Sequence, residues 1–369
     1  MFRAAALRDV TYERRFITMK KFWAILVACA LMLPCAAAFA DGDAGEVVVY
    51  NWGEYIDEDV LDMFTEETGI KVTYAMFSTN EDMYVKLKAG AANYDVIFPS
   101  DYMIERLLNE DRLEKLNYDN IPNAANILSW LREDPYNVYD PTNEYSVPYM
   151  WGTVGILYNT EMVDAPITSW TSMFDTKYVN NVFMYDSFRD SIGITLKMLG
   201  YSMNTRDWDQ INEAKEALIK QKQDGIVKAY QVDETKDKMV AGEAALALIW
   251  SGDAQYAIEL NDKLAYVVPE EGSNIWIDGM CIPKGAQNKE NAEAFINFLC
   301  REDIARMNMD EIGYCTPIQP VVDNMTDEEK ANHVWNPTAD EIARCEIFRD
   351  VGDAVMDYED VWLEIKAAR

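Results

Sequence analysis

Four short segments place a carboxylate beside an aromatic ring, a combination suited to holding an organic cation. They are Trp52-Gly53-Glu54-Tyr55, Ser100-Asp101-Tyr102, Trp250-Ser251-Gly252-Asp253 and Trp276-Ile277-Asp278. The faces of aromatic rings attract ammonium groups and cover methylenes, and carboxylates accept the hydrogen bonds of an ammonium group. Each segment alone also fits a core aromatic residue beside an acid that caps a helix. Four occurrences of the pattern favour a binding site.

The residues that common enzyme mechanisms need are scarce. The chain has one histidine, His333, which disfavours histidine-rich zinc sites and nucleophile–histidine pairs. The motifs GxSxG, GxxxxGK[ST] and HExxH are missing from the sequence, and no glycine-rich dinucleotide loop follows a predicted strand. Carboxylates are plentiful, so an acid pair of the glycosidase type stays open, although no spacing selects one. We expect a binding site with no catalytic residue, no metal and no cofactor.

The elements that must position these segments alternate between strand and helix. Apolar runs predict strands at 46–52, 71–77 and 94–98, and helical spacing predicts helices at 57–68, 78–88 and 101–109. Gly69 closes the first helix, and Ser78 and Glu81 form a capping box for the second. This order predicts an α/β fold with a mostly parallel sheet covered by helices. Three of the four segments follow predicted strands, and ligands of open α/β sheets lie beyond the carboxyl ends of strands.

A second α/β block follows a loop-like stretch at 117–146. We predict a strand from Ser146 to Tyr158 that crosses between two lobes, and a returning strand at 275–283. Between them we predict strands near 181–186, 227–232, 246–250 and 263–269 and helices near 189–199, 207–224, 233–243 and 253–261. Three helices, at 288–299, 301–312 and 338–366, end the chain. Lobe one would comprise 45–152 plus 277–322 and lobe two 153–276 plus 323–369, with a hinge and a cleft between them.

The charge of the chain restricts its partners. The 369 residues carry a formal net charge of −31. Such a surface repels phosphate backbones and anionic lipid, which argues against nucleic acid and membrane surfaces as partners. A cationic small molecule would be attracted, although acidity also serves solubility and identifies no site by itself.

The first 40 residues have the features of a secretory signal peptide. Met19-Lys20-Lys21 gives a basic start, Phe22 to Leu33 is apolar but too short to span a bilayer, and Ala38-Phe39-Ala40 is a cleavage site. We expect export to the periplasm, cleavage after Ala40 and Met19 as the initiator. Lipoprotein anchoring through Cys35 is disfavoured because Pro34 directly precedes it.

Cysteine usage predicts cross-linking near the end of the chain. The cysteines that remain after cleavage are Cys281, Cys300, Cys315 and Cys345. An even number in an exported protein predicts at least one disulfide, with three connectivities open. The spacing CxxC does not occur, so a metal or redox motif is not expected.

Several stretches together carry a resemblance to a known family. They lie at 50–55, 68–72, 94–100, 145–152, 249–252, 276–278, 297–299 and 312–317, and include Tyr-Asn-Trp-x-Glu-Tyr and Trp-x-Asp. With them the sequence resembles the spermidine/putrescine-binding periplasmic proteins of polyamine ABC transporters, over about residues 45–369. The resemblance implies a two-lobed periplasmic-binding-protein fold with a hinge and an interlobe ligand cleft, in a monomer without enzymatic activity or cofactor.

The resemblance also implies roles for site residues. The aromatic box around the aliphatic chain of the ligand would comprise Trp52, Tyr55, Trp250 and Trp276. Asp278 would bind one ammonium group and Asp190 the opposite one. The residues implied to assist at the Asp278 end are Glu54, Tyr102 and Ser100.

Five further positions bear on the choice of ligand. Asp186 and Ser187 fall where spermidine binders carry two acids, and Asp253 matches an acid of putrescine-preferring members. Phe348 replaces a glutamine of spermidine-preferring members, whereas Trp276 favours spermidine, so the preference stays open. Tyr314 lies in a matching stretch and is a possible further contact.

The implied function is capture of a polyamine, putrescine or spermidine, and its delivery to the membrane permease of an ABC importer. One alternative is the same fold binding another solute, such as another cation, an amino acid, thiamine or a metal–anion complex. An anionic ligand would need Arg or Lys, which the four segments lack. The other alternative is an exported carboxylate-dependent hydrolase.

Overall fold

The computed structural model describes residues 44–90 and 93–368. This part of the chain begins with strands that pair in parallel. Strand β1 (Glu46–Trp52) buries Val47 and Val49 and pairs in parallel with its neighbours, β2 (Lys71–Phe77) and β3 (Val96–Ile97). The helices that follow these strands are α2 (Glu58–Thr68), α3 (Asn80–Ala89) and α4 (Asp101–Asn109). The predicted order is confirmed here. The predicted signal peptide, with its cleavage site after Ala40, lies outside the described residues.

Capping residues set the ends of the first helices. The Asp57 carboxylate accepts a hydrogen bond from the Asp59 N–H, and Gly69 ends α2 with φ 75°, as predicted. The start of α3 differs from the prediction, because the Thr79 hydroxyl accepts the hydrogen bond of the Asp82 N–H. The predicted capping box of Ser78 and Glu81 is therefore wrong by one residue.

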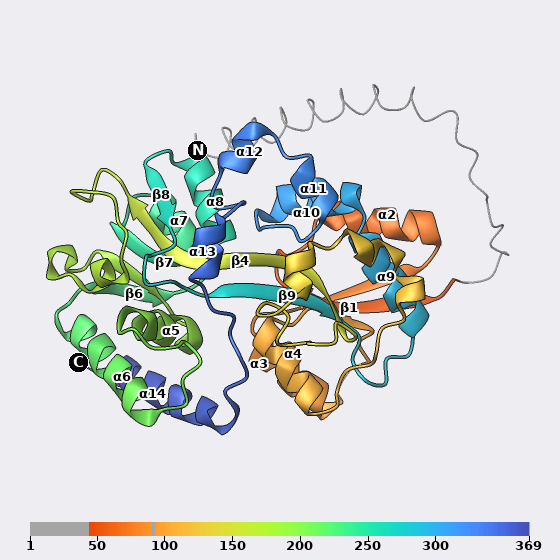
Figure 1. Ribbon diagram of the computed structural model, residues 1–369, viewed down its shortest axis with the longest axis horizontal. Helices are drawn as coiled ribbons and strands as arrows, with labels where there is room; N and C mark the ends of the chain where they lie inside the picture. Colours follow the sequence, from red (N-terminus) through yellow and green to blue (C-terminus); the bar gives the residue numbers. More distant parts are fainter. Residues whose placement is uncertain (1–43, 91–92, 369) are drawn as a thin grey trace, which may run out of the picture. The chain divides into compact units, whose positions relative to one another are not determined.

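Two long strands run through the middle of the fold. Strand β4 (Ser146–Asn159) is buried along its whole length and pairs antiparallel with β9 (Ile275–Cys281), β7 (Leu246–Trp250) and β8 (Leu264–Val267). The sheet order is β2-β1-β3-β9-β4-β7-β5-β6, where β5 is Val182–Tyr185 and β6 is Val227–Gln231, and β8 pairs with β4 off this path. We call the part built on β1, β2 and β3 the first lobe and the part built on β5 to β8 the second lobe; β4 and β9 connect them (Figure 1). The crossing and returning strands are confirmed.

Strand direction differs from the expectation of a mostly parallel sheet. The pairs β1–β2, β1–β3, β5–β6 and β5–β7 are parallel, as helix crossovers require. The pairs β3–β9, β4–β7, β4–β8 and β4–β9 are antiparallel. The cause is that β4 and β9 run in opposite directions between the lobes, so the sheet is mixed.

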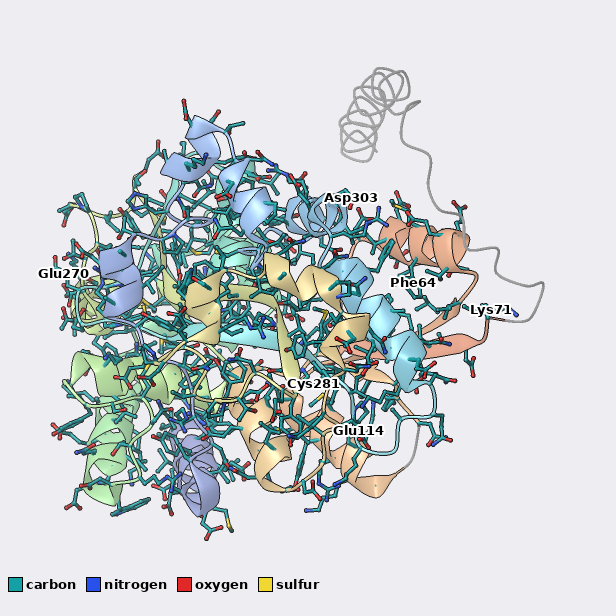
Figure 2. The ribbon with its side chains drawn as sticks, turned by 45° about the vertical axis from the view of Figure 1, so that its right-hand side comes forward. Phe64, Lys71, Glu114, Glu270, Cys281 and Asp303 are labelled. Atoms are coloured by element: carbon teal, nitrogen blue, oxygen red, sulfur yellow. The ribbon has the colours of Figure 1, made fainter. Side chains whose placement is uncertain are left out.

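Helices cover both lobes. The second-lobe helices are α5 (Phe188–Met198), α6 (Trp208–Gln223), α7 (Glu234–Val240) and α8 (Ser251–Leu260). Helix α9 (Lys289–Leu299) packs on β1, and α10 (Glu302–Ile312) contacts α2. In the core there, Phe64 meets Phe295 and Phe298 edge-on at 5.1 and 5.3 Å, whereas Lys71 and Asp303 are exposed (Figure 2). Within the described ranges, no helix combines the length and hydrophobicity that crossing a bilayer requires.

The C-terminal quarter departs most from the prediction. The helix expected at 338–366 is two helices, α13 (Ala339–Ala343) and α14 (Val355–Ala367), and the second packs on α5 and α6. Between α13 and α14, Glu346 forms an isolated parallel β-bridge with Asn274, with the Ile275 N–H donating to the Glu346 carbonyl at 3.0 Å, and Gly352–Ala354 forms a 3₁₀ turn. Two short helices, α11 (Gln319–Asp323) and α12 (Asp327–Ala331), were not predicted. The stretch predicted as loop-like contains three 3₁₀ turns, at Tyr118–Asn120, Pro122–Asn126 and Ser129–Arg132.

The predicted disulfide is wrong. Cys281, Cys300, Cys315 and Cys345 are all free. They lie on separate elements, and two thiols have backbone partners: Cys315 donates to the Val334 carbonyl and Cys345 to the Glu341 carbonyl. Burial raises the pKa of Cys300 to about 12 and that of Cys345 to about 11, so both stay protonated.

Candidate ligand-binding site

Asp278 is a buried carboxylate that no side-chain cation of the described residues pairs with. It lies in β9, and its backbone forms an isolated β-bridge with Ser100. The Tyr55 hydroxyl donates to Oδ2 at 2.7 Å, whereas Oδ1 is buried without a hydrogen-bond partner. Burial raises the pKa of Asp278 to about 6, although the Ser100 and Tyr55 hydroxyls oppose this shift. Across the described ranges no Lys or Arg forms an ion pair with it.

Three aromatic rings lie around this carboxylate. The Tyr314 ring lies 5.8 Å from that of Tyr55 and 4.9 Å from that of Trp276, and both contacts are edge-on. The Trp276 indole N–H is buried and has no partner. The unpaired carboxylate acceptor and the aromatic rings suit an ammonium group on an aliphatic chain, whereas the indole N–H, itself a donor, could not bond that group.

Two glycines, which lack a Cβ, leave room for the Tyr314 and Trp276 rings. A Cβ at Gly252 would lie 2.3 Å from two carbons of the Tyr314 ring. A Cβ at Gly152, in β4, would lie 2.6 Å from the Trp276 ring. Because Gly252 is in the first turn of α8, this packing brings the Trp250–Asp253 segment against the rings around Asp278.

Asp190 is a second buried carboxylate, at the start of α5. Its Oδ2 accepts a hydrogen bond from the Ser187 hydroxyl at 2.5 Å, and its Oδ1 accepts one from the Trp250 indole at 3.4 Å. Burial raises its pKa, and the Ser187 and Trp250 bonds and the charge of Arg189 counteract this. The partners that bond Asp190 directly are thus neutral donors.

Asp253 differs, because a lysine faces it. The Lys236 ammonium of α7 lies 3.6 Å from Asp253 Oδ1 and 3.9 Å from Glu54 Oε2. Burial raises the pKa of Asp253 to about 6, and the Lys236 charge opposes the shift. The sequence analysis missed Lys236, since a lysine on a predicted helix ordinarily indicates a solvent-exposed face.

Ser100 and Tyr102 are tied together by Asn80. The Asn80 amide donates to the Ser100 hydroxyl at 3.0 Å and to the Tyr102 hydroxyl at 3.1 Å, and Tyr102 donates to Glu81 at 3.1 Å. Asn80 and Glu81 were also missed. Their position in the first turn of a predicted helix next to a strand end was the available signal.

Arg189 and Phe348 lie together beside Tyr102. The Arg189 guanidinium lies over the Phe348 ring at 4.4 Å and over the Tyr102 ring at 5.4 Å. It donates to the Arg349 carbonyl and to the Asn204 side chain. Phe348 lies in the segment between α13 and α14, which was predicted to be part of the last helix.

Three predicted site residues lie at the margin. The Glu54 side chain is 93% exposed and approaches the cluster only through Lys236. Asp186 forms an ion pair with Lys366 of α14 at 2.7 Å. Trp52 donates its indole N–H to the Phe98 carbonyl at 2.8 Å and packs on Phe77. We define the cluster by its remaining predicted members, which are Tyr55, Ser100, Tyr102, Ser187, Asp190, Trp250, Asp253, Trp276, Asp278, Tyr314 and Phe348.

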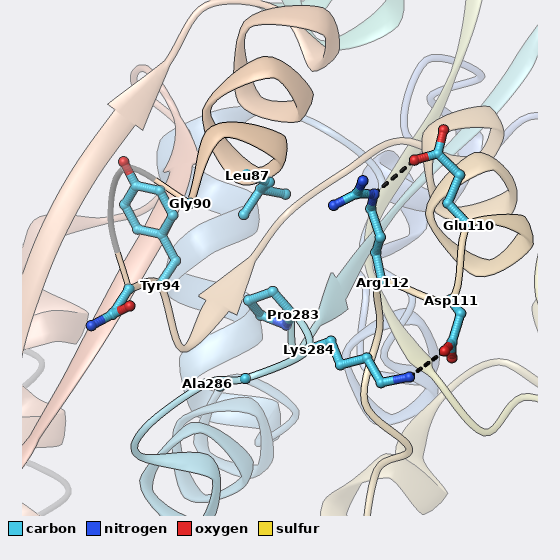
Figure 3. Close-up of a pocket in the computed structure, with 11 residues that line it drawn as sticks. Leu87, Gly90, Tyr94, Glu110, Asp111, Arg112, Pro283, Lys284 and Ala286 are labelled. Atoms are coloured by element: carbon cyan, nitrogen blue, oxygen red, sulfur yellow. Dashed lines mark hydrogen bonds and ion pairs between the residues drawn. The ribbon is translucent and has the colours of Figure 1, made fainter.

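A surface pocket elsewhere in the first lobe contains none of these residues. It is lined by Leu87, Tyr94, Pro283 and neighbouring residues (Figure 3). Its charged groups are already paired, Arg112 with Glu110 at 2.7 Å and Lys284 with Asp111. The pocket therefore has no apparent part in the chemistry of the cluster.

The fold and the cluster agree with the relatives that comparisons find. A family model described as bacterial extracellular solute-binding protein matches residues 59–337, and the chain belongs to this family. The spermidine/putrescine-binding periplasmic protein of Salmonella typhimurium is 37% identical over 357 residues, which cover 95% of this chain and 100% of that protein. These matches confirm the resemblance and the two-lobed α/β fold that it implies.

Two further comparisons extend the match. The putrescine-binding periplasmic protein SpuD of Pseudomonas aeruginosa is 33% identical over 303 residues, 78% of this chain and 82% of that protein. The crystal structure of the spermidine/putrescine ABC transporter substrate-binding protein PotD from Streptococcus pneumoniae is 38% identical. It superimposes with a TM-score of 0.77 and covers 87% of this chain and 98% of that chain.

Proposed function

We propose that this protein is an exported binding protein that captures a polyamine, putrescine or spermidine, and delivers it to the membrane permease of an ABC importer. The observation that carries the proposal is Asp278: a buried carboxylate with one unpartnered oxygen, no ion-paired cation among the described residues, and Tyr55, Trp276 and Tyr314 around it. A buried charge of this kind requires a counter-ion, and a ligand ammonium group would supply it. The relatives named above support the ligand class.

The ends of the ligand would be held by different lobes. Asp278 lies on β9 beside first-lobe residues Tyr55 and Ser100, and Asp190 lies on α5 of the second lobe. One ammonium group on each carboxylate would draw the lobes together around the aliphatic chain. The lobes would meet at about residues 152–153 and 276–277, where β4 and β9 cross between them.

The expected affinity follows from the groups involved. Burying the four methylenes of putrescine contributes about 3 kcal/mol. Each charge-assisted end contributes about 1.5–3 kcal/mol. A cation–π contact adds about 0.5–2 kcal/mol, so the contributions together reach about 6.5–11 kcal/mol. Micromolar binding corresponds to about 8 kcal/mol, which lies within this range, and affinity near micromolar is expected.

Export, location and oligomeric state are proposed from the sequence. Export would use the signal peptide, with cleavage after Ala40, and the mature protein would act in the periplasm as a monomer. No cofactor and no chemical step are needed, because the carboxylates serve as anchors.

Calorimetric titration of the mature protein tests the ligand class. We expect micromolar or tighter binding of putrescine or spermidine and no binding of glutamate or thiamine. Binding of glutamate or thiamine in preference to every polyamine would overturn the proposal.

A further inference from the structure

The three acids of the cluster differ in what balances their charge. Asp278 accepts a hydrogen bond from Tyr55, and Asp190 accepts hydrogen bonds from Ser187 and Trp250; all of these donors are neutral. Asp253 alone is ion-paired, with the Lys236 ammonium 3.6 Å from its Oδ1. Asp278 and Asp190 are therefore without a cation that bonds them among the described residues, whereas Asp253 is paired with Lys236.

Lys236 is held in this position by several groups. Its side chain is only 25% exposed, and its ammonium also lies 3.9 Å from Glu54 Oε2 and 5.3 Å from the centre of the Tyr256 ring. The other charged groups that act on this pair are Asp237, on Lys236, and Asp233, on Asp253. Acids surround the ammonium group, so leaving Asp253 would gain it no better partner.

We infer that Lys236 is a specificity-determining residue that occupies Asp253 and limits the ligand to two buried ammonium groups. The inference rests on the proposed function. A diamine places one ammonium group on Asp278 and the other on Asp190, and its two charges are then balanced. A triamine brings a third ammonium group into the cluster, where the remaining carboxylate is already neutralised and a desolvated cation without an anion is costly.

At the Tyr102 end the acids already accept hydrogen bonds from the protein: Glu81 from the Tyr102 hydroxyl, and Asp101 from the backbone N–H groups of Tyr102 and Ile277. A cation, the Arg189 guanidinium, also lies there, over the Tyr102 and Phe348 rings. Like charges repel, and both ring faces are already covered by a cation. Lys236 and Arg189 thus both disfavour binding of a third ammonium group. Of the two, it is Lys236 that forms an ion pair with a carboxylate of the cluster.

The test compares putrescine with spermidine by calorimetric titration of the wild type and three variants. Lys236→Met removes the charge and keeps most of the stem, which frees Asp253 for a ligand ammonium group. We expect spermidine binding to strengthen at least tenfold relative to putrescine binding in this variant. Lys236→Arg keeps the charge and should retain the wild-type ratio. Lys238→Met is the matched control on the same helix, because Lys238 bonds Gln231 and not the cluster.

A compensated variant covers the case in which Lys236→Met does not fold. In Lys236→Gln/Asp253→Asn both charges are removed together, so no unpaired charge remains. If Lys236 occupies Asp253, this double variant binds putrescine within about threefold of the wild type. If Asp253 holds the ligand instead, putrescine binding falls more than tenfold and the inference is overturned.

The outcomes separate this inference from the function on which it rests. A wild type that binds polyamines, with a spermidine-to-putrescine ratio that Lys236→Met leaves unchanged, contradicts the specificity role alone. An equal loss of both ligands in Lys236→Met indicates a lobe-closing contact with Glu54 and also contradicts it. A wild type that binds no polyamine overturns the proposed function itself.

Discussion

The Tyr55 hydroxyl donates a 2.7 Å hydrogen bond to Oδ2 of Asp278, a residue 223 positions further along the chain. This bond links the segment after β1 to the middle of β9, and Oδ1 of the same carboxylate is buried and has no partner. A buried carboxylate that is held through Oδ2 and has no partner on Oδ1 is preorganised for a cation.

Replacing Tyr55 by Phe should weaken ligand binding. The variant keeps the ring and removes the hydroxyl that donates to Asp278. Loss of a hydrogen bond to a charged group costs about 1.5 kcal/mol, so putrescine affinity should fall roughly tenfold in calorimetric titration. Tyr84→Phe is the control, because the Tyr84 hydroxyl bonds Glu110, outside the cluster. Equal effects of the two variants would rule out the specific role of Tyr55.

Ligand affinity should fall as the pH drops below 6. Burial raises the pKa of Asp278 to about 6, and a protonated acid cannot pair with an ammonium group. Titrations between pH 5 and 8 at constant ionic strength would measure this dependence, which Asp278→Asn should reduce. Affinity that is flat across this range would contradict the assignment.

The stability of the ligand-free protein should change with pH in a related way. Asp278 has an unfolded pKa near 3.8 and a folded pKa of about 6. Between these values the folded state holds a proton that the unfolded state has lost, so the free energy of unfolding decreases as the pH rises. The contribution of Asp278 is on the order of 2–3 kcal/mol. Asp278→Asn should therefore raise the melting temperature of the ligand-free protein at pH 7.5 and reduce its stabilisation by putrescine.

A methyl group at Gly252 should displace the Tyr314 ring. In Gly252→Ala the new Cβ would lie 2.3 Å from two ring carbons, so the ring or α8 must move. Overpacking of this kind costs about 1–3 kcal/mol, and we expect a lower melting temperature together with weaker putrescine binding. Gly53→Ala is the matched control, since nothing lies within 4 Å of a Cβ there. A Gly252→Ala variant that behaves like this control would show that the Tyr314 packing is incidental.

The mature protein should contain four free thiols. Cys281, Cys300, Cys315 and Cys345 are unpaired, and burial raises their pKa values. Thiol titration of periplasmic protein should give four reactive groups after denaturation under non-reducing conditions and slow reaction before it. Detection of fewer than four thiols would indicate a disulfide and contradict the free cysteines of the structure.

Local patterns in the sequence were sufficient for much of the fold. The apolar run of β1, the capping acid and Gly69 at the two ends of α2, and the crossing strands β4 and β9 are all features that neighbouring residues determine. The helix predicted at 338–366 is broken because the Glu346 carbonyl bonds the Ile275 N–H, a partner distant in sequence. No periodicity within the helix reports such a contact.

The residue types of the candidate site follow from the sequence, whereas their pairing does not. Acid–aromatic segments identified Asp278 and Trp276, but they carry no information that Tyr55 would bond Asp278. Lys236 was missed because its importance depends on the position of Asp253 in another helix. Long-range packing decides which predicted acids remain without a cation.

Calorimetric titration of wild type and Asp278→Asn with putrescine tests the central claim most directly. The substitution keeps the shape of the side chain and removes the charge that an ammonium group would meet. We predict micromolar or tighter binding to the wild type and a loss of roughly 2 kcal/mol or more, about thirtyfold, in the variant. Equal putrescine affinity in the two proteins would contradict the account.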